Sequence, residues 1–432
     1  MSNKGKRVLI TAGTVYGKLD DNKLVGNRIR GIWATKFAEY LKTHGHVPIV
    51  LVPDTFDKNR IDLLRAKKIE VLTHCGYEDY AIQCLEELPK RIDAAVMAAA
   101  VVNWIPAGPY PIKGKMSTEG YKENDIIEIP FRLAPRVIDR MKDACSKYVG
   151  KDFTLIGCKM TSGSTYEEMH KMAYKTLLNA RCNAVIANDL QGLKSKFIVG
   201  KDGSSIPYEN DFLEFYAELM AIIEDEYFET WGMKYNPTFD IDKDEMQRAK
   251  DIFDGIVEKY RDRFVKRVDG EDKVFGSVAV RVRARTPNAV RTGHDGGGGM
   301  DRWSEYRNYY LVSPREKGQA FTSEDAVLCC LSEATEFDLQ NQVLTLGFEK
   351  ATLNAPLMIK FADEVQAEAV IHLHEQDPDI LTDRYAPPGT VRDTNRKLKF
   401  LLDVGIAKYF GFNIEYHGLI HEIDADTYGF MR

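Results

Sequence analysis

The sequence predicts two fused α/β domains, the first of them built on a doubly wound, parallel sheet. Short apolar runs alternate with helical patterns along residues 7–227, and this alternation opens with a strand–loop–helix–strand unit. An irregular stretch around Pro237 then separates this pattern from a new mixture of helices and strands. We therefore expect a first domain at residues 1–232 and a second domain at residues 243–432.

The elements of the first domain follow from their apolar periodicity. Residues 7–11 form an apolar run that predicts a buried strand, residues 30–44 carry apolar side chains at helical spacing, and residues 47–52 predict the next strand. We expect further strands at 69–72, 94–100, 153–157 and 184–187, helices at 77–88, 165–180 and 210–227, and a hairpin at 197–203.

The second domain begins with a charged amphipathic pattern at residues 243–264, which predicts a helix with one solvated face. A tetraglycine run at 296–299, beside His294 and Asp295, interrupts the following strands and is interpreted as a surface loop. We expect strands at 275–282, 309–312, 369–374 and 412–416, the last of the chain, a short helix or strand at 323–330, and helices at 354–365 and 395–410.

Composition excludes several function classes. The 432 residues are 44% hydrophobic and 29% charged, as in ordinary globular proteins, and the formal net charge of -6 argues against a dedicated nucleic-acid binder. Seven scattered cysteines without a C-x-x-C pair predict reduced thiols. The sequence shows no apolar run of about 20 residues and no signal-peptide pattern at its beginning. We expect a cytoplasmic protein that binds neither nucleic acid nor membranes.

Ligands of doubly wound sheets bind beyond the C-terminal ends of the strands. Four segments of the first domain are expected at that edge: residues 11–14, 98–104, 157–161 and 187–189. The loop after the first strand is long and carries Lys23 and Asn27, and long loops of this kind are often functional. We expect its helix to begin near residues 26–30, where the helix N-terminus would attract a phosphate.

Six ordered motifs give the first ~230 residues a more specific signal. They are Thr11-Ala-Gly-Thr14, Leu24-Val-Gly-Asn27, Ala99-Ala-Val-Val-Asn-Trp104, Lys113-Gly-Lys115, Gly157-Cys158 and Ala187-Asn-Asp189. Together they resemble the phosphopantothenate–cysteine ligase (phosphopantothenoylcysteine synthetase) family, which has a Rossmann-like fold. The resemblance implies that CTP or ATP, with Mg²⁺, activates the carboxylate of 4′-phosphopantothenate or a related phosphorylated acid. Cysteine or another amine would then attack the acyl-nucleotide and form an amide.

The resemblance also assigns roles to residues. Asn27 would donate to the activated carbonyl, Lys113 and Lys115 would neutralise the triphosphate, and Lys23 would hold the substrate phosphate. Further contacts to nucleotide or acid are expected from Gly13, Ala99, Ala100, Asn103, Gly157, Asn188 and Asp189. The alternatives are purely structural: Asn27 would be a helix N-cap, and Lys113 and Lys115 would lie in a solvated loop. Asn103 replaces an acidic residue and Cys158 a base-stacking Phe, which leaves the choice of CTP or ATP open.

Three histidines stand out in the second domain. His372 and His374 lie two residues apart on an expected strand, so both imidazoles point to one face, and His417 follows what we expect to be the final strand. Three His ligands with one open position are typical of a catalytic Zn²⁺ or another divalent metal. The alternative is a pair of partly exposed strand histidines without a ligand.

This half resembles the class II aldolase family and its epimerase and dehydratase relatives. The matching segments are Gly276-Ser-Val-Ala-Val-Arg281, Tyr310-Leu-Val-Ser-Pro314, Phe321-Thr-Ser-Glu-Asp-Ala326, Ala369-Val-Ile-His-Leu-His374 and Tyr416-His417-Gly418. The resemblance implies that the three histidines bind a metal that stabilises an enediolate. The catalytic Glu of that family has no counterpart in residues 351–354, and Glu375 or Glu422 is considered as its substitute.

Three hypotheses about function follow. The first is an amide-forming ligase, and the second is a metal-dependent lyase, epimerase or dehydratase that acts on a sugar-like substrate through the histidines. The third is a non-catalytic fusion of two degenerate domains that binds ligands or assembles with partners. Both resembled families usually form oligomers, which implies a homo-oligomer.

Overall fold

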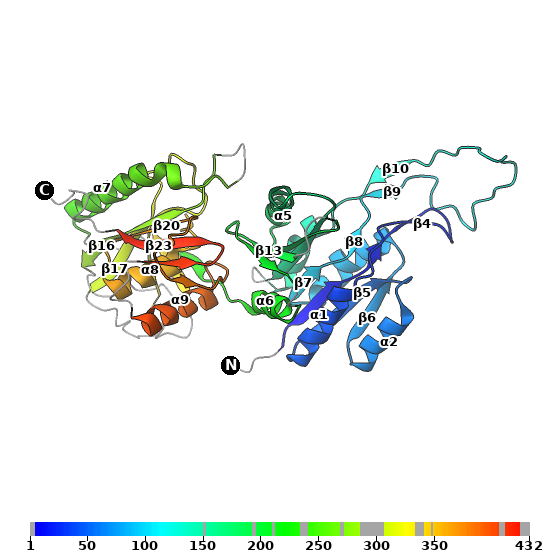
Figure 1. Ribbon diagram of the computed structural model, residues 1–432, viewed down its shortest axis with the longest axis horizontal. Helices are drawn as coiled ribbons and strands as arrows, with labels where there is room; N and C mark the ends of the chain where they lie inside the picture. The colour runs from blue at the N-terminus through cyan, green and yellow to red at the C-terminus, as the bar shows by residue number, and fades with distance from the viewer. Residues whose placement is uncertain are drawn as a thin grey trace, which may run out of the picture. The chain divides into compact units, whose positions relative to one another are not determined.

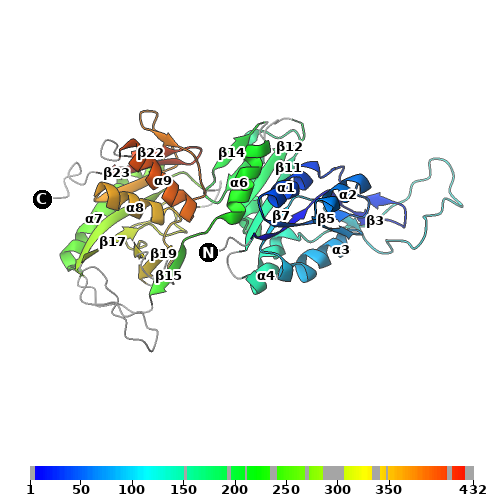
Figure 2. The same ribbon diagram turned by 90° about the horizontal axis from the view of Figure 1, so that it is seen from below.

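A computed structural model describes residues 5–149, 153–191, 196–209, 212–233, 241–267, 272–285, 306–332, 341–346, 349–405 and 411–423. The chain divides into two compact units (Figures 1 and 2). The first comprises Met1–Lys201 and Ser205–Glu224, and the second comprises Asp202–Ser204 and Asp225–Arg432. The tetraglycine run, with His294 and Asp295, lies outside the described residues.

An eight-stranded sheet forms the centre of the first unit. Its order is β14-β13-β12-β11-β7-β1-β5-β6, so the strands wind outwards from β1 in both directions. The pairs from β12 to β6 are parallel, and β13 and β14 add an antiparallel hairpin. The strands are β1 (Arg7–Thr11), β5 (Val47–Pro53), β6 (Glu70–His74), β7 (Ala94–Met97), β11 (Thr154–Thr161), β12 (Ala184–Asp189), β13 (Lys196–Gly200) and β14 (Ser205–Tyr208). The prediction of an α/β unit with a mainly parallel sheet is confirmed.

Helices cover both faces of this sheet, which is why its strands read as apolar runs rather than as alternating patterns (Figure 2). One face carries α1 (Ile32–Thr43), α2 (Lys58–Ala66) and α6 (Phe212–Glu224), and the other carries α3 (Tyr77–Ile82), α4 (Ile138–Val149) and α5 (Tyr166–Ala180). Local sequence fixes the helix starts. Asp57 caps α2, and Thr165 and Glu168 form a reciprocal capping box at α5.

An arm projects from the body of the first unit (Figure 1). It consists of β3 (Gly17–Lys18), β4 (Leu24–Val25), β9 (Trp104–Pro106), β10 (Phe131–Leu133) and the connection at residues 107–130. Behind it, β2 (Thr14–Val15) pairs with β8 (Ala100–Val101). Strands of two or three residues are too short to show a periodicity, so the sequence did not predict the arm.

The second unit is built on a nine-stranded, mainly antiparallel sheet in the order β15-β19-β18-β17-β16-β20-β23-β22-β21. Helix α7 (Lys243–Tyr260) covers one face, and α8 (Ala355–Val365) and α9 (Val391–Val404) lie on the other (Figure 1). The strands are β15 (Glu229–Met233), β16 (Ser277–Arg285), β17 (Tyr306–Val312), β18 (Val327–Leu331), β19 (Gln342–Leu346), β20 (Ala369–Leu373), β21 (Thr382–Asp383), β22 (Gly411–Ile414) and β23 (Gly418–Ile423). No described helix has the length and apolar composition that a membrane crossing needs.

Three expectations for element boundaries were wrong. Residues 412–416 do not contain the last strand, because β23 follows and pairs with both β20 and β22. Helix α9 begins before residue 395, since Thr390 accepts a hydrogen bond from the Asp393 amide and caps the helix there. Helix α1 begins at Ile32 and not near residues 26–30, because Gly31 at φ 66° turns the chain immediately before it.

Candidate functional site

A cavity of about 690 Å³ lies at the edge of the first sheet where β7, β11 and β12 end. Crevices at this edge are where doubly wound sheets bind their ligands. Five of the residues expected at the site line this cavity: Asn27, Ala99, Ala100, Asn103 and Asn188. The structure thus brings together five predicted residues from three separate segments of the chain.

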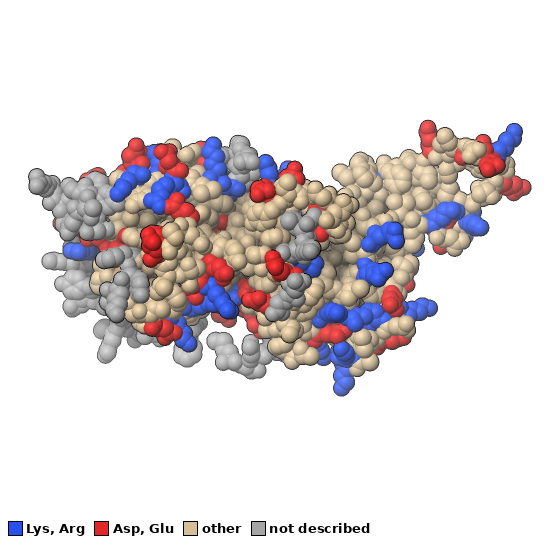
Figure 3. Space-filling view, in the orientation of Figure 1, with Lys and Arg blue, Asp and Glu red and all other residues tan. Residues whose placement is uncertain are grey.

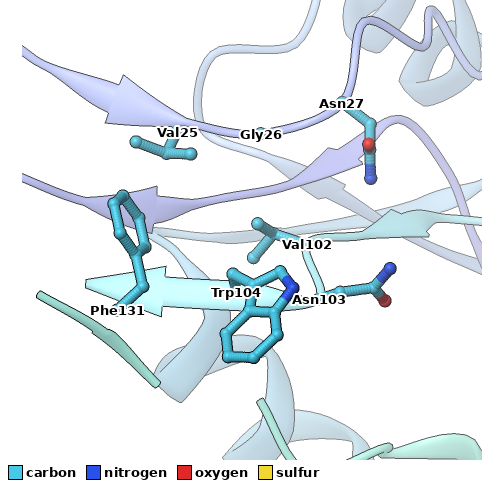
Figure 4. A pocket seen from close by; sticks show the side chains of 7 residues that line it. All are labelled: Val25, Gly26, Asn27, Val102, Asn103, Trp104 and Phe131. Atoms are coloured by element: carbon cyan, nitrogen blue, oxygen red, sulfur yellow. The ribbon is translucent and has the colours of Figure 1, made fainter. Parts of the chain in front are cut away.

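Asn27 lies at the boundary between this cavity and a second one of about 540 Å³. Its side-chain amide donates to the Val101 oxygen at 3.2 Å, and its own main-chain oxygen accepts a hydrogen bond from the Thr14 hydroxyl. Figure 4 shows the amides of Asn27 and Asn103 at one end of the second cavity, opposite Val25 and Phe131. The alternative role of Asn27 as a helix N-cap is wrong, because Gly31 occupies that position in α1.

Four cationic side chains that the sequence analysis did not single out also line the larger cavity. They are Arg136, Lys159, Lys175 and Lys196. Lys196 lies over the Trp33 ring, with its Nζ 5.7 Å from the ring centroid, and burial lowers the pKa of its ammonium. Lys159 lies near the end of β11 and Lys196 at the start of β13, on the two strands that flank β12, so no local pattern in the sequence could signal them.

The lysines expected to hold phosphates lie elsewhere. Lys113 and Lys115 are exposed on the arm, in the connection between β9 and β10, and neither is among the residues that line the larger cavity. Lys23 forms an ion pair with the buried Asp20 at 3.1 Å. Asp20 also accepts from the Met116 amide, which ties the arm together, and these hydrogen bonds hold the pKa of Asp20 below its usual range.

Three other expected residues support the frame around the cavity. Gly13, at φ 80°, accepts a hydrogen bond from the Ala100 amide at 2.9 Å. A Cβ on Gly157 would lie 3.0 Å from Ile138, so this glycine lets α4 approach β11 closely. Asp189 accepts four hydrogen bonds from Thr161, Gly163, Ser164 and Gln191, which fix the loop after β11.

The second unit contains a group of three histidines, His372, His374 and His417, which we call the trihistidine cluster. One ring nitrogen of each lies within 4.8 Å of those of the other two, close enough for all three to hold a metal ion. His372 lies on β20 and His374 follows that strand, whereas His417 lies in the turn between β22 and β23 rather than after a final strand. The three histidines that the sequence singled out do meet in the fold.

The protonation of the trihistidine cluster suits a metal. Burial lowers the pKa of His372 to about 4 and holds those of His374 and His417 well below the usual range, so all three imidazoles are neutral near pH 7. The Nδ1 atom of His372 contacts the Leu419 oxygen at 2.8 Å, which fixes the tautomer and leaves Nε2 to bind. That Nε2 atom is buried and has no hydrogen-bond partner among the residues that the structure describes.

The surroundings of the trihistidine cluster are polar. Lys317 is buried, and burial lowers its pKa to about 7, while its charge acts on His372 and His374. The hydroxyls of Ser277 and Thr352 lie 2.8 Å apart, and Ser277 is in register with His372 on the neighbouring strand. Glu375 and Glu422 are the two expected substitutes for a catalytic Glu. Glu375 pairs with Arg263, and Glu422 lies on β23.

The charges on the visible surface are mixed. In Figure 3 acidic and basic side chains are interspersed over both units, and the arm carries both signs near its tip.

Residues 3–210 match the family described as the DNA/pantothenate metabolism flavoprotein C-terminal domain. The Coenzyme A biosynthesis bifunctional protein CoaBC of Thermococcus kodakarensis is 27% identical over 206 residues, which are 46% of this chain and 46% of that protein. The chain therefore matches about half the length of this curated relative.

Similar solved structures cover about half of the chain. The DNA/pantothenate metabolism flavoprotein from Streptococcus pneumoniae is 16% identical, with a TM-score of 0.39, and covers 50% of this chain and 98% of its own. The C-terminal domain of a CoaBC protein is 18% identical, with a TM-score of 0.38, and covers 51% of this chain and 95% of its own.

Proposed function

We propose that the first unit is a nucleotide-dependent ligase that joins 4′-phosphopantothenate, or a related phosphorylated acid, to cysteine or another amine. The observation that carries the proposal is the cavity at the ends of β7, β11 and β12, where five of the predicted site residues meet four cations. The match of residues 3–210 to the pantothenate-metabolism family and the similarity to CoaBC support the same reaction class.

The proposed reaction has two steps, activation of the acid and formation of the amide. A carboxylate attacks the α-phosphorus of CTP or ATP, pyrophosphate leaves, and the amine then displaces the nucleotide monophosphate to form the amide. Lys159, Lys196 and Arg136 are suited to neutralise the phosphates together with Mg²⁺, and Asn27 and Asn103 can donate to the acyl oxygen. Ala99 and Ala100 leave room for a ligand to approach the main chain closely.

Lys23, Lys113 and Lys115 belong to the proposal as residues to be tested. Lys113 and Lys115 lie in the connection at 107–130, so this connection would have to bring them to a bound nucleotide before they could act on it. We further propose a homo-oligomer as the working form. The cytoplasm is the proposed compartment, where seven cysteines, none of them in a disulfide, would remain reduced.

The test is the stoichiometry of the reaction. Purified protein with Mg²⁺, CTP or ATP, 4′-phosphopantothenate and cysteine is expected to form one amide for each pyrophosphate released, as measured by mass spectrometry and a phosphate-coupled assay. Lys159→Ala is expected to slow both signals, and Lys147→Ala, at an exposed position on α4, is expected to leave both unchanged. Amide formation without pyrophosphate, or neither product, would refute the proposed reaction.

A second function is proposed for the second unit, because three neutral imidazoles meet there. We propose that His372, His374 and His417 bind Zn²⁺ or another divalent metal, which would act as a Lewis acid in lyase, epimerase or dehydratase chemistry on a sugar-like substrate. Loss of metal from His372→Ala and His417→Ala variants, measured by elemental analysis, is the expected result. A native protein that takes up no metal after stripping would refute this second function and leave a second unit without metal-dependent catalysis.

A further inference from the structure

The trihistidine cluster has a carboxylate neighbour that comes from a distant part of the chain. Asp202 lies in the Asp202–Ser204 turn, which joins β13 to β14 and groups with the second unit. Its Oδ2 atom lies 3.1 Å from the Nε2 atom of His417, and the two side chains are only 4% and 1% exposed. The turn therefore places an acidic oxygen beside the third histidine, away from solvent.

Hydrogen bonds hold the carboxylate in place through its other oxygen. Oδ1 of Asp202 accepts from the Ser204 hydroxyl at 2.7 Å and from the Tyr385 hydroxyl at 3.2 Å. Within the described part of the chain, neither Oδ2 nor the His417 Nε2 atom that it faces has a hydrogen-bond partner, although both are buried. The 3.1 Å contact is thus close but not aligned for an N–H···O bond.

Unpartnered buried atoms of this kind need an explanation. Each one costs about 1–3 kcal/mol if nothing compensates it, and unassigned ions are a recognised cause. The Nε2 atoms of His372 and His417 and the Oδ2 atom of Asp202 are all in this state. Two ligands of a tetrahedral zinc ion with bonds of about 2.0 Å lie about 3.3 Å apart, which is close to the observed 3.1 Å separation.

The turn also contacts the ring that supports the second histidine. Gly203 has φ 76°, and a Cβ there would lie 2.8 Å from the Phe275 ring, so the turn approaches this ring closely. Phe275 stacks on His374 with ring centroids 4.6 Å apart and an angle of 9°. One three-residue turn is therefore fitted to both His374 and His417.

We propose that Asp202 is the fourth protein ligand of the metal held by the trihistidine cluster. The proposal rests on the proposed metal site and deepens it by naming a fourth ligand from a distant segment. A substrate would then reach the metal by expansion of its coordination to five, which catalytic zinc sites allow. A set of three neutral imidazoles and one carboxylate gives Zn²⁺ four protein ligands and a net charge of +1. Four protein ligands are typical of tightly held ions, so the site retains its metal more firmly than one made of three histidines and water.

The experiment compares full-length native protein with Asp202→Ala and Asp202→Asn. The metal is stripped with a chelator, Zn²⁺ is titrated back against a chromophoric competitor, and Co²⁺ is added in parallel so that its visible absorption reports the ligand set. Asp225→Asn is the matched control, since it removes another buried carboxylate of the second unit, one that pairs with Arg392 at 2.7 Å. Thermal unfolding of the stripped proteins checks that each variant is folded.

The proposal expects one Zn²⁺ per native chain, an affinity about 100-fold or more lower in Asp202→Ala, and a changed Co²⁺ spectrum. Asp225→Asn is expected to keep the native affinity and spectrum. Equal affinity in Asp202→Ala, or weaker binding with an unchanged Co²⁺ spectrum, would overturn the role of Asp202 while leaving the metal site standing. A native protein that binds neither ion would overturn the metal site itself.

Discussion

The side-chain amide of Asn27 donates a hydrogen bond of 3.2 Å to the main-chain oxygen of Val101, 74 residues further along the chain. This bond links the segment after β4 to β8 at the mouth of the larger cavity. The same amide also donates to the Ala100 oxygen at 3.4 Å, and a bound acyl oxygen would take the place of this longer bond.

The first prediction concerns this amide. Asn27→Ala is expected to lower kcat for amide formation about 100-fold, since the loss of one donor to a developing oxyanion has an effect of that size. The midpoint of thermal unfolding should fall by only a few degrees, because one partly exposed hydrogen bond contributes about 1 kcal/mol. Asn22→Ala, at an exposed position on the arm, is the control and should change neither quantity. A large loss of stability with unchanged kcat would show that Asn27 only ties the two segments together.

The second prediction concerns the cations. Lys196→Ala is expected to raise the Kd for the nucleotide about 10- to 100-fold, because a charge-assisted contact to phosphate contributes about 1.5–3 kcal/mol. Calorimetric titration with CTP and ATP measures this effect directly, and Lys147→Ala supplies the control.

Lys113→Ala and Lys115→Ala separate the sequence-based assignment from the geometric one. If these variants bind nucleotide as the native protein does, the phosphates are held by the cavity cations alone. If they weaken binding as strongly as Lys196→Ala does, the connection that carries them must reach the nucleotide in solution.

The third prediction concerns stability at low pH. His74 is 1% exposed, and burial lowers its pKa to about 4 from a usual value near 6.5. The folded state then binds fewer protons than the unfolded state between these values, so His74 stabilises the fold fully above pH 6.5 and progressively loses that contribution as pH falls towards 4. The full effect on the free energy of unfolding is about 3 kcal/mol.

His74→Phe is expected to flatten this pH dependence. Hydrogen exchange of β5 and β6 between pH 4 and 7 provides the measurement, because it reports on the first unit alone. The exposed His44→Phe serves as control and should retain the native dependence. If His74→Phe keeps the native pH dependence of the free energy of unfolding, another group must cause the loss of stability at low pH.

The sequence predicted the regular parts of the first sheet because their physical causes are local. Residues 8–10 are all apolar, since the strand they form is covered on both faces, and this run can be recognised without knowledge of the rest of the chain. The sequence did not predict the start of α1 because the turn at Gly31 depends on packing against a distant residue. A Cβ on Gly31 would lie 2.5 Å from the Gly13 nitrogen.

Site residues were predictable where a motif or a strand period carried them. His372 and His374 could be paired by their two-residue spacing, whereas Asp202 lies 170 residues earlier and was identified only as part of a turn. Lys159 and Lys196 carry no motif, and only the order of the strands brings them to one cavity. Contacts of this kind depend on tertiary structure, which periodicity does not encode.

The most direct test of the account is pyrophosphate release by the purified protein with Mg²⁺, comparing CTP with ATP, with and without 4′-phosphopantothenate, and with and without cysteine. We expect release with at least one nucleotide, and this release should depend on the acid and fall in Asn27→Ala and Lys196→Ala. Release that is independent of the acid, or no release with either nucleotide, would contradict a carboxylate-activating site in the first unit.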